Sequence, residues 1–570
     1  MTVMVARPVG QRRDPRQRHA LIGVAHTRLM MLMLLFAAGV TVVVGRLAML
    51  AILSGPADGV RTAALAGRGD IVDRNGAPLA RTIDAWTIAV HPRKLIGDPM
   101  DIAARLAALM PDRGDQAWFY SQLTKDVSFT YLQRRASPQL VEQVNAIGEP
   151  ALVFARETQR LYPQSTMAAH ALGFLSTDGR GMSGMERVLD AQLTNPATSG
   201  KPVALSLDVR VQAAMESELG RAMTAYQARG AAGLMLDVDT GEVISMVSLP
   251  VFNPNRVGMA GTEELRNITT QSVYELGSTF KVITAAIAME TGVVKDLSRR
   301  FDATAPLQVG RFRIKDDHAQ NRWLNIPETL VHSSNIATAR IADEIGAARM
   351  QAMFRRLGMD TKPDIELREK GRPLWPSYWA RTTTMTSAYG HGIAVTPLHL
   401  ASAYAAMING GIWRPSTLLK VAPGHAPAGR RVISPETSRR MRQLVRLIVQ
   451  EGTGRKAEAP GYRVGGKTGT AEVAQGGGYA KNANVSTFAA AFPMDAPRYV
   501  VIAMLDSPKR VEANQFQTTA AYTAAPVVSR VISRTGAMLG ILPDDHRDVD
   551  QSDIMPLLWR APGEQAAHGE

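Results

Sequence analysis

The sequence of 570 residues contains no cysteine, which excludes disulfide bonds and thiolate metal sites. It also lacks zinc-ligand spacing, a recognition-helix pattern and an aromatic-plus-basic RNA motif, so nothing in it favours nucleic-acid binding. It has no internal repeat, and after residue 53 no segment is long and apolar enough to cross a membrane. What remains is an ordinary globular composition, with 45% hydrophobic and 20% charged residues, in a chain long enough for two or more domains.

Acidic residues are outnumbered, since 65 Lys and Arg face 51 Asp and Glu, and the formal charge of +14 suits an anionic membrane or polymer. The basic excess is dense at the N-terminus, which carries Arg7, Arg12, Arg13, Arg16, Arg18 and Arg28. An uncharged apolar run of 17 residues follows, from Leu29 to Gly45, and apolar character resumes to Leu53. This pattern predicts a cytoplasmic tail at 1–28, a single-pass anchor at 29–53 and an exported remainder. The competing interpretation is a signal peptide cleaved after the small residues at 37–39.

Residues 60–205 mix short helical and strand patterns and contain no catalytic constellation. The stretch GDIVDRNGAPLA predicts two short strands joined by a turn at Asn75-Gly76. The polar candidates in this region are best explained as ion pairs that hold the fold, and they are Arg160, Tyr162, Glu186 and Arg187.

Residues 206–542 have a different pattern. GLMLDVDTGEVISMVSLP predicts a hairpin with its turn at 239–241, and three further strands follow in YRVGGKTGTAEV, VSTFAAAF and RYVVIAMLD. Helical patterns occupy about 325–455, and a final apolar helix covers about 520–537. Two early and three late strands with helices between them predict an α/β domain with one five-stranded antiparallel sheet covered by helices. The acidic, aperiodic segment 543–570 is predicted to be a flexible tail.

The stretch VYELGSTFKVIT contains Ser278 and Lys281, three residues apart at the start of an apolar run. On a helix these residues share a face, so a partly desolvated Lys281 could accept the proton of a Ser278 nucleophile. Exposed N–H groups at the helix start also suit an oxyanion. Alone, such a pair is more often a serine cap and a surface lysine than a catalytic pair.

Two further motifs favour the catalytic interpretation. Ser333-Ser334-Asn335 lies between helical segments, and Lys467-Thr468-Gly469-Thr470 lies on a predicted strand. S-x-x-K, S-x-N and K-T-G each occur once, in the order typical of penicillin-binding proteins and serine β-lactamases.

With these motifs the sequence resembles a class B penicillin-binding protein, a membrane-anchored peptidoglycan D,D-transpeptidase, from its basic N-terminus to about residue 540. RGDIVDRNG, RLYP, GMSGME, YGHGIAVTPLHLA and GYRVGGKTGTAE support the resemblance and favour the cell-division type, penicillin-binding protein 3, over the elongation type. In this resemblance 60–205 is a periplasmic pedestal of the dimerisation type, and 206–542 is the transpeptidase domain. Three features depart from the family pattern: Leu276 replaces a proline, Ser334 stands where many β-lactamases have aspartate, and 514–527 has few glycines.

The resemblance implies a role for each motif residue. Ser278 attacks the penultimate D-Ala of a D-Ala-D-Ala peptide, Lys281 accepts its proton, and Ser333, near both lysines, returns a proton to the departing D-Ala. Asn335 binds the substrate amide and orients Lys281, and the N–H groups of Ser278 and Thr470 hold the oxyanion. The substrate carboxylate is bound by Lys467, Thr468 and Thr470, with Gly469 beside it on the strand.

The resemblance implies no metal or organic cofactor. It implies as partners peptidoglycan stem peptides, β-lactams, a separate membrane glycan polymerase and other division proteins, with a periplasmic catalytic domain at the septum. Its alternatives are an elongation-type enzyme, a β-lactamase, a penicillin-sensing receptor and an inactive scaffold. The expected pedestal disfavours a β-lactamase, the short cytoplasmic tail disfavours a receptor, and the complete set of motif residues disfavours a scaffold.

Overall fold

The computed structural model describes residues 15–53, 67–198, 200–475 and 478–560. The chain divides into two compact units, Met1–Leu65 and Ala66–Glu570. The sequence predictions for residues 1–14, 54–66 and 561–570 lie outside the described residues.

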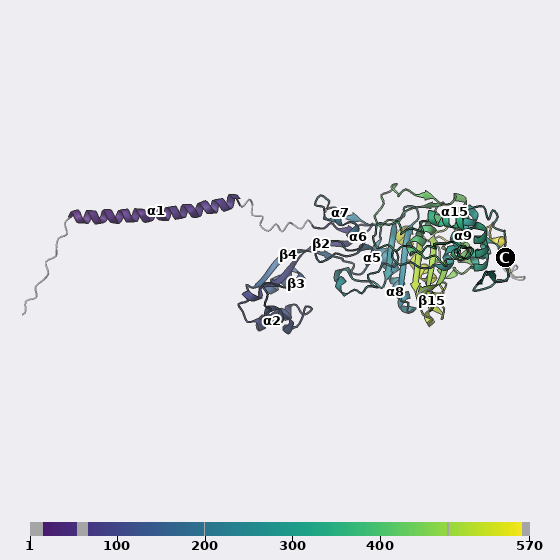
Figure 1. The fold of residues 1–570 in the computed structure, drawn as a ribbon, viewed down its shortest axis with the longest axis horizontal. Helices are drawn as coiled ribbons and strands as arrows, with labels where there is room; N and C mark the ends of the chain where they lie inside the picture. The colour runs from purple at the N-terminus through teal and green to yellow at the C-terminus, as the bar shows by residue number, and fades with distance from the viewer. Residues whose placement is uncertain (1–14, 54–66, 199, 476–477, 561–570) are drawn as a thin grey trace, which may run out of the picture. The chain divides into compact units, whose positions relative to one another are not determined.

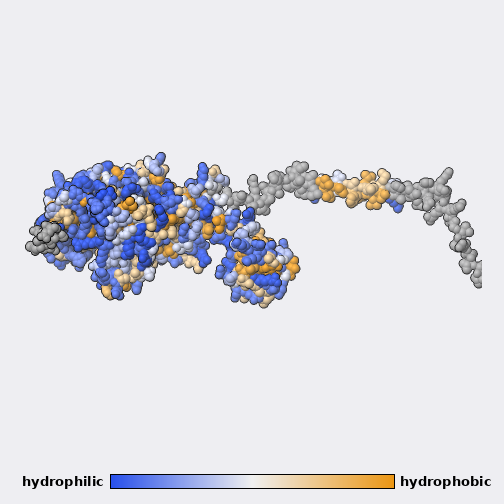
Figure 2. Space-filling view, turned by 180° about the vertical axis from the view of Figure 1, so that it is seen from behind, coloured by the Kyte–Doolittle hydropathy of each residue, from blue (hydrophilic) through white to orange (hydrophobic). Residues whose placement is uncertain are grey.

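The first unit contains one long helix, α1 (Pro15–Leu53). Its stretch Thr27–Arg46 has 20 residues, a mean hydropathy of 2.1 and exposed side chains, seen as a continuous hydrophobic segment in Figure 2. At about 1.5 Å per residue this stretch is long enough to cross a hydrocarbon core of about 30 Å. The predicted N-terminal apolar helix is therefore confirmed, and its length and composition suit a membrane anchor.

The second unit begins with the pedestal, which is built on a small sheet of order β3-β2-β1-β5, with β4 also paired to β2. Its elements are β1 (Ile71–Val72), β2 (Pro78–Val90), η1 (Pro92–Lys94), α2 (Pro99–Leu109), α3 (Gln116–Leu123), β3 (Thr130–Ala136), α4 (Pro138–Asn145), β4 (Leu152–Leu161), α5 (Ala169–Leu172), α6 (Gly184–Val188), α7 (Asp190–Thr194) and β5 (Val203–Ala204). The predicted turn at Asn75-Gly76 joins β1 to β2, because Gly76 takes a φ of +89° and the Asp73 carboxylate accepts from the Asn75 N–H at 2.8 Å.

A buried ion cluster holds the pedestal together. The Glu186 carboxylate is fully buried and pairs with Arg68 Nε at 2.6 Å and Arg160 Nε at 2.7 Å, while the Tyr162 hydroxyl donates to it at 3.3 Å. A buried carboxylate is stable only when its charge and lone pairs are satisfied, as they are here. Arg187 pairs with Glu369 at 3.9 Å. These contacts agree with the structural role expected of the polar pedestal residues.

The catalytic part of the unit contains a five-stranded sheet of order β14-β15-β16-β6-β7 with antiparallel neighbours. Its strands are β6 (Gly230–Asp237), β7 (Val243–Leu249), β14 (Gly465–Gln475), β15 (Gly478–Phe492) and β16 (Tyr499–Asp506). The predicted five-stranded antiparallel sheet is confirmed, and β14 lies at its edge. Short ribbons β8 (Phe301–Ala303), β9 (Leu307–Val309), β10 (Phe312–Ile314), β11 (Arg322–Leu324), β12 (Ile412–Trp413) and β13 (Arg430–Arg431) lie outside it.

Helices cover both faces of this sheet (Figure 1). The helices in contact with its strands are α8 (Val209–Ala225), α14 (Pro397–Ile408), α15 (Pro435–Glu451) and α16 (Ala524–Thr535). The other helices of this part are α9 (Phe280–Glu290), α10 (Ile326–Val331), α11 (Asn335–Ile345), α12 (Ala347–Arg356) and α13 (Arg381–Ser387), with 3-10 turns η2 (Pro254–Met259), η3 (Gly277–Thr279), η4 (Arg455–Ala457), η5 (Glu512–Asn514), η6 (Ala537–Leu539) and η7 (Met555–Leu557). The sequence of β16 explains the two layers: Ile502 and Met504 join the apolar cluster with α9 and α14, whereas Val501 and Leu505 join that with α8 and α16.

The described part of the C-terminal segment packs on the catalytic domain, so the prediction of a flexible tail is wrong for residues 543–560. Ile554 is fully buried, Arg446 on α15 pairs with Asp548 at 2.9 Å, and the Asn325 amide donates to the Leu557 carbonyl at 2.7 Å. The segment lacks periodicity because it forms no long helix or strand. Asp545, Asp548 and Asp553 pair with arginines that lie far away in the sequence, which the composition of the segment alone could not reveal.

Candidate active site

Ser278 lies in the 3-10 turn η3, directly before α9. The turn is stabilised from behind, because the Tyr404 hydroxyl donates to the Thr279 carbonyl at 2.8 Å and the Thr279 hydroxyl donates to the Leu276 carbonyl at 2.9 Å. Ser278 makes no cap hydrogen bond to α9, whose N-cap residue is Thr279. The capping explanation therefore fails, and the half-buried Ser278 hydroxyl stays available at the helix start.

Two glycines let the edge strand approach this turn. Gly277 has a φ of +55°, and a Cβ there would lie 2.7 Å from the Thr470 carbonyl oxygen. A Cβ on Gly469 would lie 2.3 Å from the Leu276 carbonyl oxygen. Side chains at these positions would separate β14 from the nucleophile turn, so the glycines of both motifs are needed for contact between their backbones.

Lys281 lies in the first turn of α9 and is 1% exposed. Its Nζ donates to the Ser333 carbonyl at 2.5 Å and to the Ser333 Oγ at 3.1 Å. Burial lowers the pKa of Lys281 to about 7, although the carboxylates of Asp316 and Asp317 oppose this shift. Near neutral pH, a large fraction of Lys281 is therefore a neutral amine that can accept a proton.

The S-x-N motif occupies the connection between α10 and α11. Ser333 takes a φ of +58°, a left-handed conformation that is strained for a serine and that forms the sharp turn into α11. The Ser334 hydroxyl caps α11 through the Ala337 N–H at 3.1 Å. The serine in the middle of this motif thus has a structural role, while Ser333 faces Lys281.

Asp316, which belongs to none of the three motifs, holds this connection in place. Its carboxylate accepts from the Ser334 hydroxyl at 2.7 Å and from the Asn335 N–H at 2.5 Å. It therefore stabilises the N-terminus of α11 and places a negative charge near Lys281. No motif surrounds Asp316, so only the tertiary contact reveals its role.

The K-T-G motif lies on β14, paired with β15 in a register that places Lys467 opposite Ala489. Lys467 is fully buried, and its Nζ donates to the Thr468 Oγ1 at 3.0 Å and to the Thr453 Oγ1 at 3.3 Å. Burial, and then repulsion by Lys281, hold the pKa of Lys467 well below its usual range. Thr453 follows α15 and is a second residue without a sequence signal. The Thr470 Oγ1 accepts from the Ala520 N–H at 3.1 Å, which fixes the 514–527 segment beside β14.

The structure brings all three motifs together but differs from the expected contacts in two ways. The Asn335 amide donates to the Lys315 carbonyl at 3.0 Å, and in the described part of the chain it makes no hydrogen bond to Lys281. Among the described residues, Lys467 likewise makes no hydrogen bond to Ser333. Among the described residues, Ser333 therefore hydrogen-bonds to Lys281 and not to Lys467.

Two neighbouring residues have structural explanations. Leu276 is 1% exposed and fills the core behind the turn. Its φ of −100° lies outside the range of about −65 ± 15° that a proline would impose at this position. His391 Nδ1 lies 3.1 Å from the Glu275 carboxylate, which also accepts from the Gly392 N–H at 2.9 Å. These contacts hold the YGHG turn against the nucleophile segment, as expected of a structural histidine.

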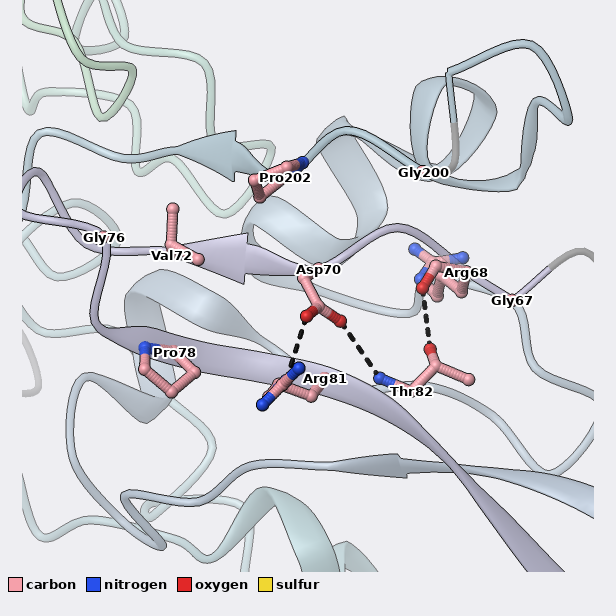
Figure 3. A pocket seen from close by; sticks show the side chains of 10 residues that line it. All are labelled: Gly67, Arg68, Asp70, Val72, Gly76, Pro78, Arg81, Thr82, Gly200 and Pro202. Carbon is pink, nitrogen blue, oxygen red and sulfur yellow. Dashed lines mark hydrogen bonds and ion pairs between the residues drawn. The ribbon is translucent and has the colours of Figure 1, made fainter.

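A pocket of about 390 Å³ in the pedestal carries polar groups but no comparable chemistry (Figure 3). The Asp70 carboxylate accepts from Arg81 Nε at 3.0 Å and from the Thr82 N–H at 3.3 Å, and the Thr82 hydroxyl donates to the Arg68 carbonyl at 2.7 Å. These groups are paired with one another, which agrees with a structural pedestal.

Comparison with known families agrees with this geometry. Residues 231–533 match the family described as penicillin binding protein transpeptidase domain, and residues 63–201 match the penicillin-binding protein dimerisation domain.

Related proteins cover most of the chain. It is 40% identical over 489 residues to the probable peptidoglycan D,D-transpeptidase FtsI of Caulobacter vibrioides, which covers 83% of this chain and 82% of that protein. It is 27% identical over 526 residues to the peptidoglycan D,D-transpeptidase FtsI of Escherichia coli, covering 86% of each. A crystal structure of penicillin binding protein 3 from Mycobacterium tuberculosis, complexed with aztreonam, matches with a TM-score of 0.66 and 25% identity, covering 85% of this chain and 98% of that one. The chain therefore belongs to the penicillin-binding protein family, as a transpeptidase with a dimerisation-type pedestal.

Proposed function

We propose that this protein is a peptidoglycan D,D-transpeptidase that cross-links stem peptides during septal wall synthesis through an acyl-enzyme on Ser278. The observation that carries the proposal is a buried Lys281 amine, one helical turn from Ser278, with its Nζ 3.1 Å from Ser333 Oγ. The names of its relatives, which include two FtsI transpeptidases, support the activity and the division type.

In the proposed acylation, Ser278 Oγ attacks the carbonyl carbon of the penultimate D-Ala while neutral Lys281 accepts the hydroxyl proton. The oxyanion would be held by the backbone N–H groups of Ser278 and Thr470, which the close approach at Gly277 supports. The bond to the terminal D-Ala then breaks. Ser333, hydrogen-bonded to Lys281, would relay the proton to the departing amine.

Substrate binding is proposed on the edge strand. β14 has β15 as its neighbour in the sheet, so its opposite edge can pair with an extended peptide that ends in D-Ala-D-Ala. Lys467, Thr468 and Thr470 would bind the terminal carboxylate, and Asn335 the substrate amide. Because burial lowers the pKa of Lys467, a bound carboxylate would favour its protonated form and so draw a proton into the site.

The acyl-enzyme would be resolved by an amine from a second stem peptide, which forms the cross-link and restores Ser278. A β-lactam resembles D-Ala-D-Ala and would acylate the same serine. An elongation-type enzyme or a β-lactamase would use the same residues. The FtsI relatives favour the division type over the elongation type. The pedestal disfavours a β-lactamase, because β-lactam hydrolysis does not require such a domain.

We also propose the arrangement of the chain: residues 1–28 in the cytoplasm, residues 29–53 of α1 in the inner membrane, and the pedestal (60–205) and catalytic domain (206–542) in the periplasm. The pedestal carries no catalytic constellation in its described part, so glycan polymerisation would come from a separate membrane partner. Purified protein that polymerised lipid-linked disaccharide on its own would contradict this. Depletion of the protein, followed by rescue with a tagged copy, tests the septal location.

Labelled penicillin tests the chemistry directly. Wild-type protein and the Ser298→Ala control, which changes an exposed serine just beyond α9, should form a long-lived covalent adduct. Ser278→Ala should form none. An adduct that is released rapidly would indicate a β-lactamase, and no adduct in the wild type would refute the transpeptidase.

A further inference from the structure

Residues 554–559 of the C-terminal segment form a strap that contacts the helix leading into the S-x-N motif. The strap contains the 3-10 turn η7 and begins at Ile554, which is fully buried in the apolar core. Two of its backbone groups, the Leu557 carbonyl and the Trp559 N–H, make hydrogen bonds to the start of α10. Because α10 ends two residues before Ser333, these bonds join the C-terminal segment to the active site.

Glu328 is the residue of α10 that contacts the strap through its side chain. This side chain has no exposed surface, so its charge must be compensated within the protein. One carboxylate oxygen, Oε1, accepts from the Trp559 N–H at 2.9 Å and from Arg322 Nη1 at 2.7 Å. The other, Oε2, accepts from the Asn325 N–H at 3.1 Å. The strap therefore supplies one of three donors that satisfy a buried negative charge at the start of α10.

Arg322 makes a second connection between the strap and the motif. Its guanidinium lies over the Trp559 indole ring, with Cζ 5.1 Å from the ring centroid, and its Nη2 lies 3.3 Å from His332 Nε2. Burial, and then the charge of Arg322, lower the pKa of His332, so the ring is neutral near pH 7 and its Nε2 can accept from the guanidinium. Arg322 thus bridges the strap and the residue that directly precedes Ser333.

The helix α10 passes these contacts on to the motif. It has six residues, and a helix this short is stable only when other parts of the protein hold it. Its Leu330 carbonyl accepts from the Ser333 N–H at 3.3 Å, and its Thr329 carbonyl accepts from the next N–H along the chain at 3.0 Å. These bonds fix the left-handed turn at Ser333, whose Oγ lies 3.1 Å from Lys281 Nζ. A shift of α10 would therefore move Ser333 relative to Lys281.

We propose that the strap is a positioning element of the active site, which holds α10 through Glu328 and Arg322 so that Ser333 stays in contact with Lys281. The strap acts through α10 and contributes no group to the chemistry. This role rests on the proposed function, because it requires that Ser333 and Lys281 take part in acylation. Displacement of a catalytic group by about 1 Å can slow a reaction about 100-fold, so a weaker hold on α10 should appear as slower acylation.

The test measures acylation of Ser278 by a chromogenic β-lactam over a range of concentrations. Wild-type protein is compared with a truncation after Met555, which keeps the buried Ile554 and removes the rest of the strap, and with a matched truncation after Arg560, which keeps the whole strap. The truncation after Met555 should lower the maximal acylation rate constant about tenfold. The half-saturating concentration should change little, because binding is proposed on β14, and so should the final amount of adduct. The truncation after Arg560 should react as wild type does.

Point variants of Trp559 separate the effect of its N–H from that of its ring. Trp559→Phe keeps the N–H and an aromatic ring for Arg322, and it should acylate as fast as wild type. Trp559→Ala keeps the N–H but loses the ring. Trp559→Pro loses both, and the preceding Leu558, with a φ of −75° and a ψ of 130°, has an extended conformation that suits a residue before proline. The rate constant should therefore fall further in Trp559→Pro than in Trp559→Ala.

Thermal melting establishes that each variant is folded, and Trp559→Pro, which changes an exposed residue, carries the test if the truncated chain does not fold. A strap that only stabilised the fold would affect the melting temperature and the amount of adduct but not the rate constant. That result would refute the positioning role, as would a folded Trp559→Pro that acylates as fast as wild type. A wild-type protein that forms no adduct would instead refute the proposed function.

Discussion

The pH dependence of acylation should follow the proton on Lys281. With a pKa of about 7, roughly one molecule in eleven has a neutral Lys281 at pH 6, and about ten in eleven have one at pH 8. If the neutral amine is the base, the acylation rate should rise about tenfold between these pH values and then level off.

Substitution of Asp317 should shift the rising limb of this pH–rate profile, which is the pH range over which the acylation rate increases. Its charge raises the pKa of Lys281, and its side chain makes no hydrogen bond to another described residue, in contrast to Asp316. Asp317→Asn should therefore lower the pKa of Lys281 by a few tenths to about one unit, since a single charge acts across a partly screened distance. The rising limb should shift to lower pH by that amount. Asp316→Asn should shift it in the same direction but should also weaken the cap of α11.

The assay is the second-order rate of acylation by a chromogenic β-lactam, measured between about pH 5 and 9. Asp112→Asn, an exposed carboxylate in the pedestal, is the matched control and should not shift the limb. A pH-independent rate would refute Lys281 as the base. A limb that moves to higher pH in Asp317→Asn would refute the electrostatic account of its pKa.

Three further predictions concern stability and access. Lys281→Met should abolish acylation yet raise the free energy of unfolding, by up to about 3 kcal/mol near pH 8. In the wild type the unfolded chain binds the lysine proton that the folded state releases between about pH 7 and 10.5, so wild-type stability rises with pH in that window. Deletion of residues 543–570 should lower the melting temperature, because burial of Ile554 alone contributes about 1.5–3 kcal/mol. Gly277→Ala should fold but acylate at least about tenfold more slowly, since its Cβ would meet the Thr470 carbonyl.

Each of these three predictions would be contradicted by a specific experimental result. Calorimetric unfolding at several pH values would contradict the first if Lys281→Met were less stable than wild type. Thermal melting would contradict the second if the truncated protein melted with the full chain. Acylation kinetics would contradict the third if Gly277→Ala, shown to be folded by circular dichroism, reacted as fast as wild type.

The sheet and the motifs were predictable because each rests on local sequence. The apolar patterns of β6, β7 and β16 identify strands, although the structure buries both of their faces, and the spacing from Ser278 to Lys281 is fixed by one turn of helix. The turn at Asn75-Gly76 follows from the backbone freedom of glycine. These features need no knowledge of distant residues.

The features of the site and fold that the sequence does not predict depend on tertiary contacts. Asp316, Thr453 and Tyr404 reach the site from separate segments, and nothing near them in sequence predicts it. The contact of Asn335 with the Lys315 carbonyl depends on how the loop before α10 folds back. The composition of the C-terminal segment predicts flexibility, whereas its packing depends on arginines of α15. The low pKa of Lys281 is likewise a consequence of burial, which spacing cannot supply.

The central claim is that the acyl group on Ser278 is transferred to an amine. The most direct test gives the purified enzyme a donor peptide ending in D-Ala-D-Ala together with an amino acceptor, and follows the products by mass spectrometry. The account predicts release of one D-Ala for each cross-linked peptide formed, dependent on Ser278 and Lys281. Release of D-Ala with only the hydrolysed donor, at saturating acceptor, would contradict it.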